Sequence, residues 1–171
     1  MGRGSAGAAE PGSPGSAQEY QLKAAFLFNF VKFTTWPAKA FKDAKSPFCL
    51  GVVGQNPFDR VLREVVANET HQGRSFIVEE LQATDDLRHC HLLFVSASLR
   101  NSAAELIQRL GSEPVLTVAD HEGFLDQGGM IQFFQQDQSI RFAIDPARPE
   151  ATGMKLSSKL RTLSRALPRS R

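Results

Sequence analysis

The chain has 171 residues, of which 42% are hydrophobic, and a formal net charge of +2. This composition suits one globular domain and excludes a largely disordered chain. Both signs of charge are spread along the chain, whereas nucleic-acid binders usually concentrate basic residues on one face. No run reaches the roughly 18 apolar residues that a membrane-spanning helix needs.

Residues 1–18 are rich in Gly, Ser, Ala and Pro and are expected to be disordered, because they offer too little apolar surface to offset the entropy of ordering. The segment lacks the apolar stretch of a signal peptide. A cloning remnant, a native linker and a misassigned start all remain open. A single domain is predicted over residues 19–168.

The domain is expected to open with a helix over residues 19–35 that ends before Pro37. Four apolar residues of this segment fall on one stripe at the helical period: Leu22, Phe26, Phe30 and Phe33. Strands and helices then alternate. Apolar runs predict strands at 48–53, 74–81, 91–96 and 114–119. Periodic segments and caps predict helices at 56–67 and 101–110, with shorter helical turns near Thr84 and Phe124.

The pattern changes towards the C-terminus. Residues 130–134 and 140–144 flank a polar turn and predict an antiparallel hairpin. A final helix is expected to run to about residue 167, with Leu156, Leu160, Leu163 and Leu167 on one stripe. The order of elements predicts an α/β fold: a three-layer helix–sheet–helix sandwich, with a mainly parallel sheet and an antiparallel C-terminal hairpin.

Catalytic motifs are not found in the sequence. The G-x-S-x-G, H-E-x-x-H and Walker A patterns are missing, and Gly51-Val-Val-Gly54 has too few glycines for a dinucleotide fingerprint. We therefore predict a protein that is not an enzyme and has no cofactor.

The tightest polar cluster is His89-Cys90-His91. On a strand, the two histidines would share one face and Cys90 would lie on the other. No third ligand is suggested nearby, so solvated histidines at a strand entrance are favoured and no metal site is predicted.

Two loops follow predicted strands, where α/β sheets commonly bind ligands. Gly54 and Asn56 lie in the first loop, and Asp120 and His121 in the second. These four residues are the candidate ligand-binding groups. Helix capping is the alternative for Asn56 and Asp120. The pair Gly128-Gly129 predicts a positive φ or a close backbone approach.

The ordered motifs of the chain resemble the YfiR-like family. They are EYQLKAAFLFNFVKFTTWP at 19–37, the Gly-x-x-Pro-Phe turn at 54–58, HLLFVSAS at 91–98, PVLTVAD at 114–120, GFLDQGGMIQF at 123–133, IRFAID at 140–145 and GMKLSSKLRTLSRAL at 153–167. The resemblance covers roughly residues 19–167, and the order and spacing of the motifs make it specific.

The resemblance implies a periplasmic protein that restrains a membrane-bound diguanylate cyclase, lowers cyclic di-GMP and disfavours biofilm. It implies a homodimer, an outer-membrane lipoprotein that relieves the restraint, and no enzymatic activity. The spread of charge and the lack of a long apolar run predict, separately, no binding of nucleic acid and no insertion into the membrane.

The two cysteines, Cys49 and Cys90, are too few for a disulfide scaffold, and from the residues alone they are either one disulfide or two buried thiols. The resemblance implies a disulfide between them. Their positions at the starts of neighbouring strands are compatible with that bond.

The leading hypothesis is an interaction protein. We expect its partner surface at the closing hairpin and the final helix, with Phe134, Phe142 and Leu156 as trial positions, although burial in the core explains them equally well. The alternatives are a small-ligand sensor using residues 54–58 and 120–123, a hydrolase or transferase around His89, His91 and Asp120, and nucleic-acid binding through the basic C-terminal helix.

Overall fold

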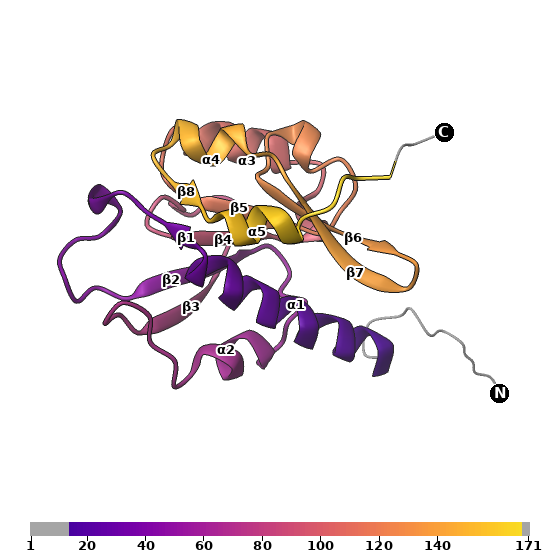
Figure 1. The fold of residues 1–171 in the computed structure, drawn as a ribbon, viewed down its shortest axis with the longest axis horizontal. Helices are drawn as coiled ribbons and strands as arrows, with labels where there is room; N and C mark the ends of the chain where they lie inside the picture. Colours follow the sequence, from indigo (N-terminus) through magenta and orange to yellow (C-terminus); the bar gives the residue numbers. More distant parts are fainter. Residues whose placement is uncertain (1–13, 169–171) are drawn as a thin grey trace.

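The central feature of the computed structural model, which describes residues 14–168, is a six-stranded sheet in the order β3-β2-β4-β5-β6-β7 (Figure 1). β2 to β6 run parallel, and β7 pairs antiparallel with β6. The strands are β2 (Phe48–Val53), β3 (Phe76–Leu81), β4 (Leu92–Val95), β5 (Leu116–Ala119), β6 (Ile131–Gln136) and β7 (Ser139–Ile144). The predicted α/β sandwich is confirmed.

Three of the inner strands, β2, β4 and β5, are buried on both faces. Every residue of β2, β4 and β5 is buried. Helices must cover both sides of such strands, which is why their sequences are continuous apolar runs instead of alternating ones.

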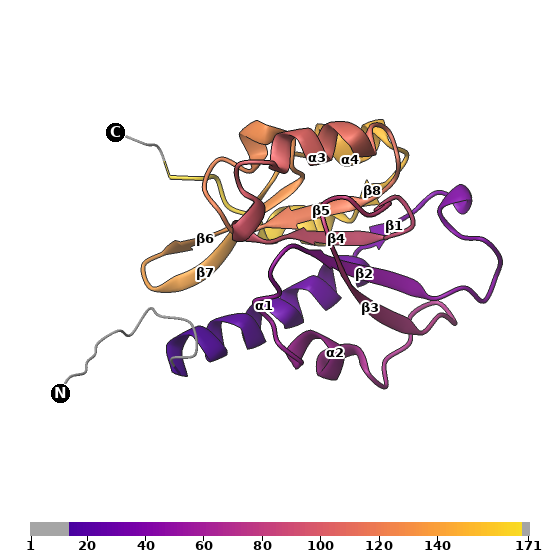
Figure 2. The ribbon, with the colours of Figure 1, turned by 180° about the vertical axis from the view of Figure 1, so that it is seen from behind.

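Helices cover the two faces of the sheet as separate layers (Figures 1 and 2). On one face lie α1 (Pro14–Lys32), α2 (Val61–Val66) and α5 (Ser158–Leu163), whose apolar residues share one core cluster. On the other face lies α3 (Ala103–Leu110), packed in a second cluster with alternate residues of β2 and β4. The alternation within β2 is clear, because Leu50 and Val52 face the first cluster and Cys49 and Val53 the second.

The first helix differs from its prediction at its start and in its buried face. It begins at Pro14, so residues 14–18 are helical and not disordered, while residues 1–13 lie outside the described part. Of the predicted stripe, Phe30 is fully buried and Phe26 and Phe33 are partly buried against the core, but Leu22 is 47% exposed. The other fully buried apolar residues of the helix are Ala24, Leu27 and Val31. Phe30 sits centrally, with its ring 4.9 Å from that of Phe142 and 5.7 Å from that of Phe133.

The helix predicted from Asn56 to Ala67 is shorter and starts later, at Val61. Asp59 adopts a left-handed φ of 53°, which interrupts any helix at that point. Asn56 instead accepts a hydrogen bond from the Phe58 N–H at 2.8 Å, as in an Asx turn. The turn near Thr84 is also not helical. Short 3₁₀ turns are η1 (Ala38–Ala40), η2 (Ala97–Leu99) and η3 (Leu125–Gln127).

The hairpin is confirmed, and its tight turn places Asp137 and Gln138 at φ values of 53° and 64°. The prediction of one long final helix is wrong. Three short elements replace it: α4 (Ala147–Ala151), β8 (Lys155–Leu156) and α5. β8 pairs antiparallel with β1 (Thr34–Thr35), which follows α1, and Leu163 is 50% exposed.

Candidate functional site

The two cysteines meet at the amino end of the parallel strands. Cys49 lies in β2 and Cys90 just before β4, and both are buried free thiols. Their Sγ atoms are 3.9 Å apart, whereas a disulfide bond is about 2.05 Å long. Gly51 makes room for this pair, because a Cβ there would come within 2.7 Å of the Cys90 Sγ. The hydrogen bond with Cys49, together with burial, raises the pKa of the Cys90 thiol.

His91 is a structural residue at the same edge. Its Nδ1 accepts from the Cys49 N–H at 3.0 Å, and its Nε2 lies 2.8 Å from the Ala40 carbonyl oxygen, to which it donates in the neutral tautomer that these contacts require. Burial lowers the pKa of His91, which favours this neutral form. The ring also stacks on Phe41 at 4.5 Å. Both ring nitrogens are therefore used to hold the η1 segment against β2.

His89 points elsewhere, so the predicted shared face of the two histidines is wrong. Because β4 begins only at Leu92, strand alternation does not apply to residues 89–91. His89 is exposed, and its Nε2 lies 2.6 Å from the Glu79 Oε1 of β3. One potential ligand atom each from Cys49, His89 and Cys90 lie within 4.8 Å of one another. The adjacency of Cys49 and Cys90 was expected from the order of the strands, but the position of His89 beside them was not, because residues 89–91 precede β4.

The first predicted loop lies at the opposite, carboxyl end of the strands, and its polar groups bind neighbouring parts of the chain. A Cβ on Gly54, which has a φ of +95°, would meet the Ser98 Oγ at 2.8 Å, and the Gln55 N–H donates to the same oxygen. The Asn56 Nδ2 donates to the Asp59 carbonyl and to the Glu80 carboxylate, at 3.0 Å each. The polar groups of this turn are thus engaged within the chain.

Asp120, in the second predicted loop, anchors α1 instead of capping a helix. Its Oδ2 accepts from the Tyr20 hydroxyl at 2.6 Å and from the Lys23 ammonium at 2.8 Å. Lys23 also pairs with Glu19. Burial and the nearby Asp120 charge raise the pKa of Tyr20 above its usual range. The capping prediction is wrong, since η3 begins five residues later with no side-chain cap. The sequence did contain one sign of this contact, because Lys23 lies among the apolar residues of α1 and a buried lysine needs an acidic partner.

His121 lies beside Asp120 in sequence but not in its network. The ring is buried, contacts Phe124 edge-on, and has its Nε2 2.7 Å from the Gln127 Oε1. A ligand at Gly54, Asn56, Asp120 or His121 would have to displace these internal contacts. Their role in ligand binding stays a prediction.

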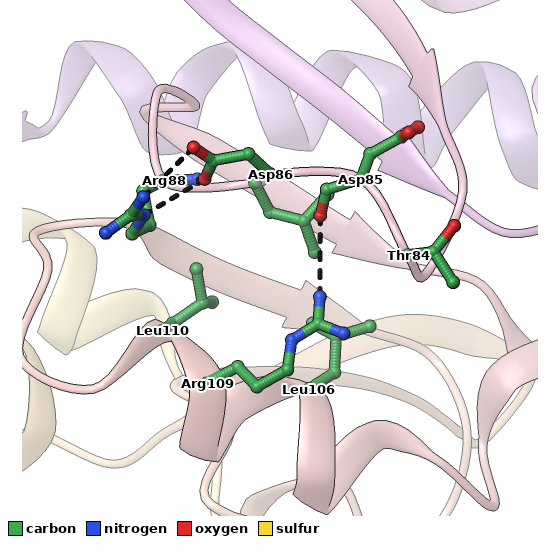
Figure 3. Close-up of a pocket in the computed structure, with 8 residues that line it drawn as sticks. Thr84, Asp85, Asp86, Arg88, Leu106, Arg109 and Leu110 are labelled. Carbon is green, nitrogen blue, oxygen red and sulfur yellow. Dashed lines mark hydrogen bonds and ion pairs between the residues drawn. The ribbon is translucent and has the colours of Figure 1, made fainter.

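A pocket of about 410 Å³ opens elsewhere, between the turn after β3 and α3 (Figure 3). The arginine side chains that line it already have partners. Arg88 pairs with Asp86 at 3.0 Å. Arg109 donates to the Ala83 carbonyl at 2.6 Å and lies 3.5 Å from the Asp85 carbonyl. The pocket offers a shallow polar hollow and no convergent set of unpaired catalytic groups among the residues that line it.

The three predicted partner-binding residues occupy different environments. Phe142 and Leu156 are 3% and 9% exposed and belong to the core cluster under α1, in agreement with the interpretation that they are core residues. Phe134 is half-buried on β6, opposite Arg141 of β7.

The arrangement is that of a three-layer α/β domain. At each end of the sheet, most of the polar groups described above bind other groups of the same chain nearby. The chain matches the model of the YfiR/HmsC-like family over residues 20–165, and it belongs to that family. The family is regulatory and non-catalytic, and membership supports a general role as a periplasmic regulator of diguanylate cyclase signalling. No curated protein shows significant similarity to the chain. Within residues 14–168, no helix has the length and apolar character needed to cross a membrane.

Proposed function

We propose that this protein restrains a membrane-bound diguanylate cyclase from the periplasm by binding the periplasmic region of the enzyme. Restraint lowers cyclic di-GMP and disfavours biofilm. The observation that carries the proposal is the family match, which spans almost the whole described domain. The internal engagement of the polar groups at both sheet ends fits a protein that acts through its surface.

The restraint has a simple thermodynamic requirement. A protein that lowers the activity of the cyclase must bind the inactive form of the cyclase more tightly than the active form, since equal affinity shifts no equilibrium. The surface that makes this distinction is therefore the essential part of the molecule.

The β6–β7 hairpin is the surface that we assign to the cyclase. It extends beyond the helical layers, and β7 is the last strand of the sheet (Figures 1 and 2). The Arg165 N–H donates to the Phe142 carbonyl at 2.8 Å, so the chain itself covers β7 at that residue. The part nearer the turn remains as an edge to which a partner strand can add. Phe134 supplies a half-buried aromatic group beside it.

We expect Phe134→Ala to weaken binding to the purified periplasmic region of the cyclase by about ten-fold, since truncating an aromatic interface anchor typically costs upwards of 1 kcal/mol. Isothermal titration calorimetry measures the affinity. The matched control is Ile77→Ala, which removes a 40% exposed apolar side chain from β3, at the other end of the sheet. Equal affinities for the two variants and the wild type, with unchanged melting temperatures, would place the interface elsewhere.

The active form in this proposal is a homodimer. An outer-membrane lipoprotein relieves the restraint by competing with the cyclase for binding to this protein. Light scattering on the purified protein tests the first point, because a dimer has twice the mass of the 18.8 kDa chain. Loss of the cyclase from the complex when the lipoprotein is added tests the second.

A further inference from the structure

Three side chains of the types that can ligate a metal ion lie together at the amino end of the sheet, outside the surface assigned to the cyclase. They are Cys49 of β2, Cys90 before β4, and His89, and their potential ligand atoms lie within 4.8 Å of one another. We propose that the protein with reduced thiols binds one Zn²⁺ ion through Cys49, His89 and Cys90.

The separation of the two sulfurs fits a shared metal ion. Two Zn–S bonds of about 2.3 Å at a tetrahedral angle place the sulfurs about 3.8 Å apart. The Sγ atoms of Cys49 and Cys90 are 3.9 Å apart. The cysteines thus already hold the spacing of a tetrahedral edge, and Gly51 provides the space for it because any Cβ there would collide with the Cys90 sulfur.

His89 is oriented in the manner of a zinc ligand. Metal-bound histidines usually donate their second ring N–H to a carboxylate, which fixes the ring and its tautomer. The Glu79 Oε1 lies 2.6 Å from the His89 Nε2 and can take that N–H, which leaves Nδ1 with a lone pair for the metal. Glu79 is therefore a positioning residue in this site. His91 is not a ligand, since the Cys49 N–H and the Ala40 carbonyl occupy its two nitrogens.

The site is reachable from the surface. A pocket of about 400 Å³ is lined by all three ligands and by Ile77. Among these lining residues, Cys49 and Cys90 are buried and His89 is exposed. Three protein ligands leave the fourth tetrahedral position for water or for a group from outside the domain.

The chemistry of the ligands selects a thiophilic ion. Thiolate and imidazole favour Zn²⁺ over Mg²⁺ or Ca²⁺, which prefer oxygen. Two thiols lose their protons on binding, so the two thiolates neutralise the charge of the ion. Arg88, a cation that also lines this pocket, is paired with Asp86. A disulfide between the same sulfurs would remove both thiolates, so only the reduced pair is able to bind the ion.

The test is a Zn²⁺ titration of the fully reduced, chelator-treated protein without oxygen, in competition with a chromophoric chelator. We expect one Zn²⁺ per chain. His89→Ala and Cys90→Ser should each weaken binding by at least about ten-fold, and Glu79→Gln by about ten-fold. The matched control is His71→Ala, which removes a histidine outside the cluster and should leave the affinity unchanged. Co²⁺ should give thiolate-to-metal absorption in the wild type that is lost in Cys90→Ser.

His89 is exposed, so His89→Ala is expected to fold, and its circular dichroism and melting temperature check this. If Cys90→Ser unfolds, the result for His89→Ala decides. The proposal is overturned if the wild type, with two free thiols confirmed by titration, binds no Zn²⁺. It is equally overturned if folded His89→Ala binds as tightly as the wild type or if His71→Ala weakens binding as much as His89→Ala does.

Discussion

Lys23 and Asp120 form a buried ion pair between α1 and the end of β5. Their charged atoms are 2.8 Å apart, and their side chains are only 5% and 8% exposed. We expect Asp120→Ala to lower the free energy of unfolding by about 3 kcal/mol, because it removes one partner and leaves a buried charge with fewer contacts. Urea denaturation measures the change. Asp126→Ala, which truncates an exposed aspartate of η3, is the control and should change stability by less than about 0.5 kcal/mol.

Replacing both charges distinguishes the electrostatic cause from lost packing. Lys23→Met combined with Asp120→Leu should be less destabilising than the sum of the single changes, since neither charge is then left unpaired. Additive losses would show that the pair contributes only through the volume of its side chains.

Single residues also show what the sequence could reveal. The prediction that Gly128-Gly129 needs a special backbone is confirmed: Gly128 has a φ of +106°, and a Cβ on Gly129 would overlap the Phe124 ring. His91 was misassigned because its two hydrogen-bond partners, at residues 40 and 49, come from contacts that no local pattern encodes.

At the scale of elements, α5 depends on its cap. The Ser157 Oγ accepts from the Leu160 N–H at 3.1 Å. Ser157→Ala should lower the free energy of unfolding by about 1 kcal/mol, the usual cost of losing a serine cap. Ser158→Ala, one residue further into the helix, keeps that bond and should change stability much less. Equal melting temperatures for the two variants would contradict the capping role.

Cys49 of β2 and Cys90, just before β4, are the cysteines whose disulfide the family resemblance implies. In an oxidising solution we expect Cys49 and Cys90 to form it, which requires the sulfurs to close from 3.9 Å to about 2.05 Å. The bond would add about 3–4 kcal/mol to stability on the chain-entropy model. Thiol titration of the oxidised, denatured protein should find no free cysteine. Two free thiols would refute the bond without touching the proposed zinc site.

Elements with a strong local pattern were predicted well, and those fixed by distant contacts were not. The continuous apolar runs correctly predicted β4 and β5, and Gly111 correctly predicted the end of α3. The final segment failed because β8 exists only through its pairing with β1, about 120 residues earlier. Its leucine stripe therefore looked like one uninterrupted helix.

At the scale of the whole molecule, the alternation of strands and helices was enough to predict the three layers, and the ordered motifs were enough to indicate the family. The meeting of Cys49 and Cys90 followed from the predicted strand order, but the approach of His89 to them was not predictable, since His89 precedes β4 and contacts Glu79 of β3. The same limit applies to the partner surface, because Phe134 and Phe142 differ in burial although both belong to one apolar hairpin.

Restraint of a membrane diguanylate cyclase is the function that we propose for this protein. The most direct measurement is the rate of cyclic di-GMP synthesis by the full-length cyclase in membrane vesicles whose periplasmic side is accessible, with increasing amounts of this protein. We predict a saturable decrease of roughly five-fold or more, in the usual range of coupling between sites, and a weaker response to Phe134→Ala than to Ile77→Ala. A rate that stays constant up to saturating concentrations of the folded protein would contradict the account.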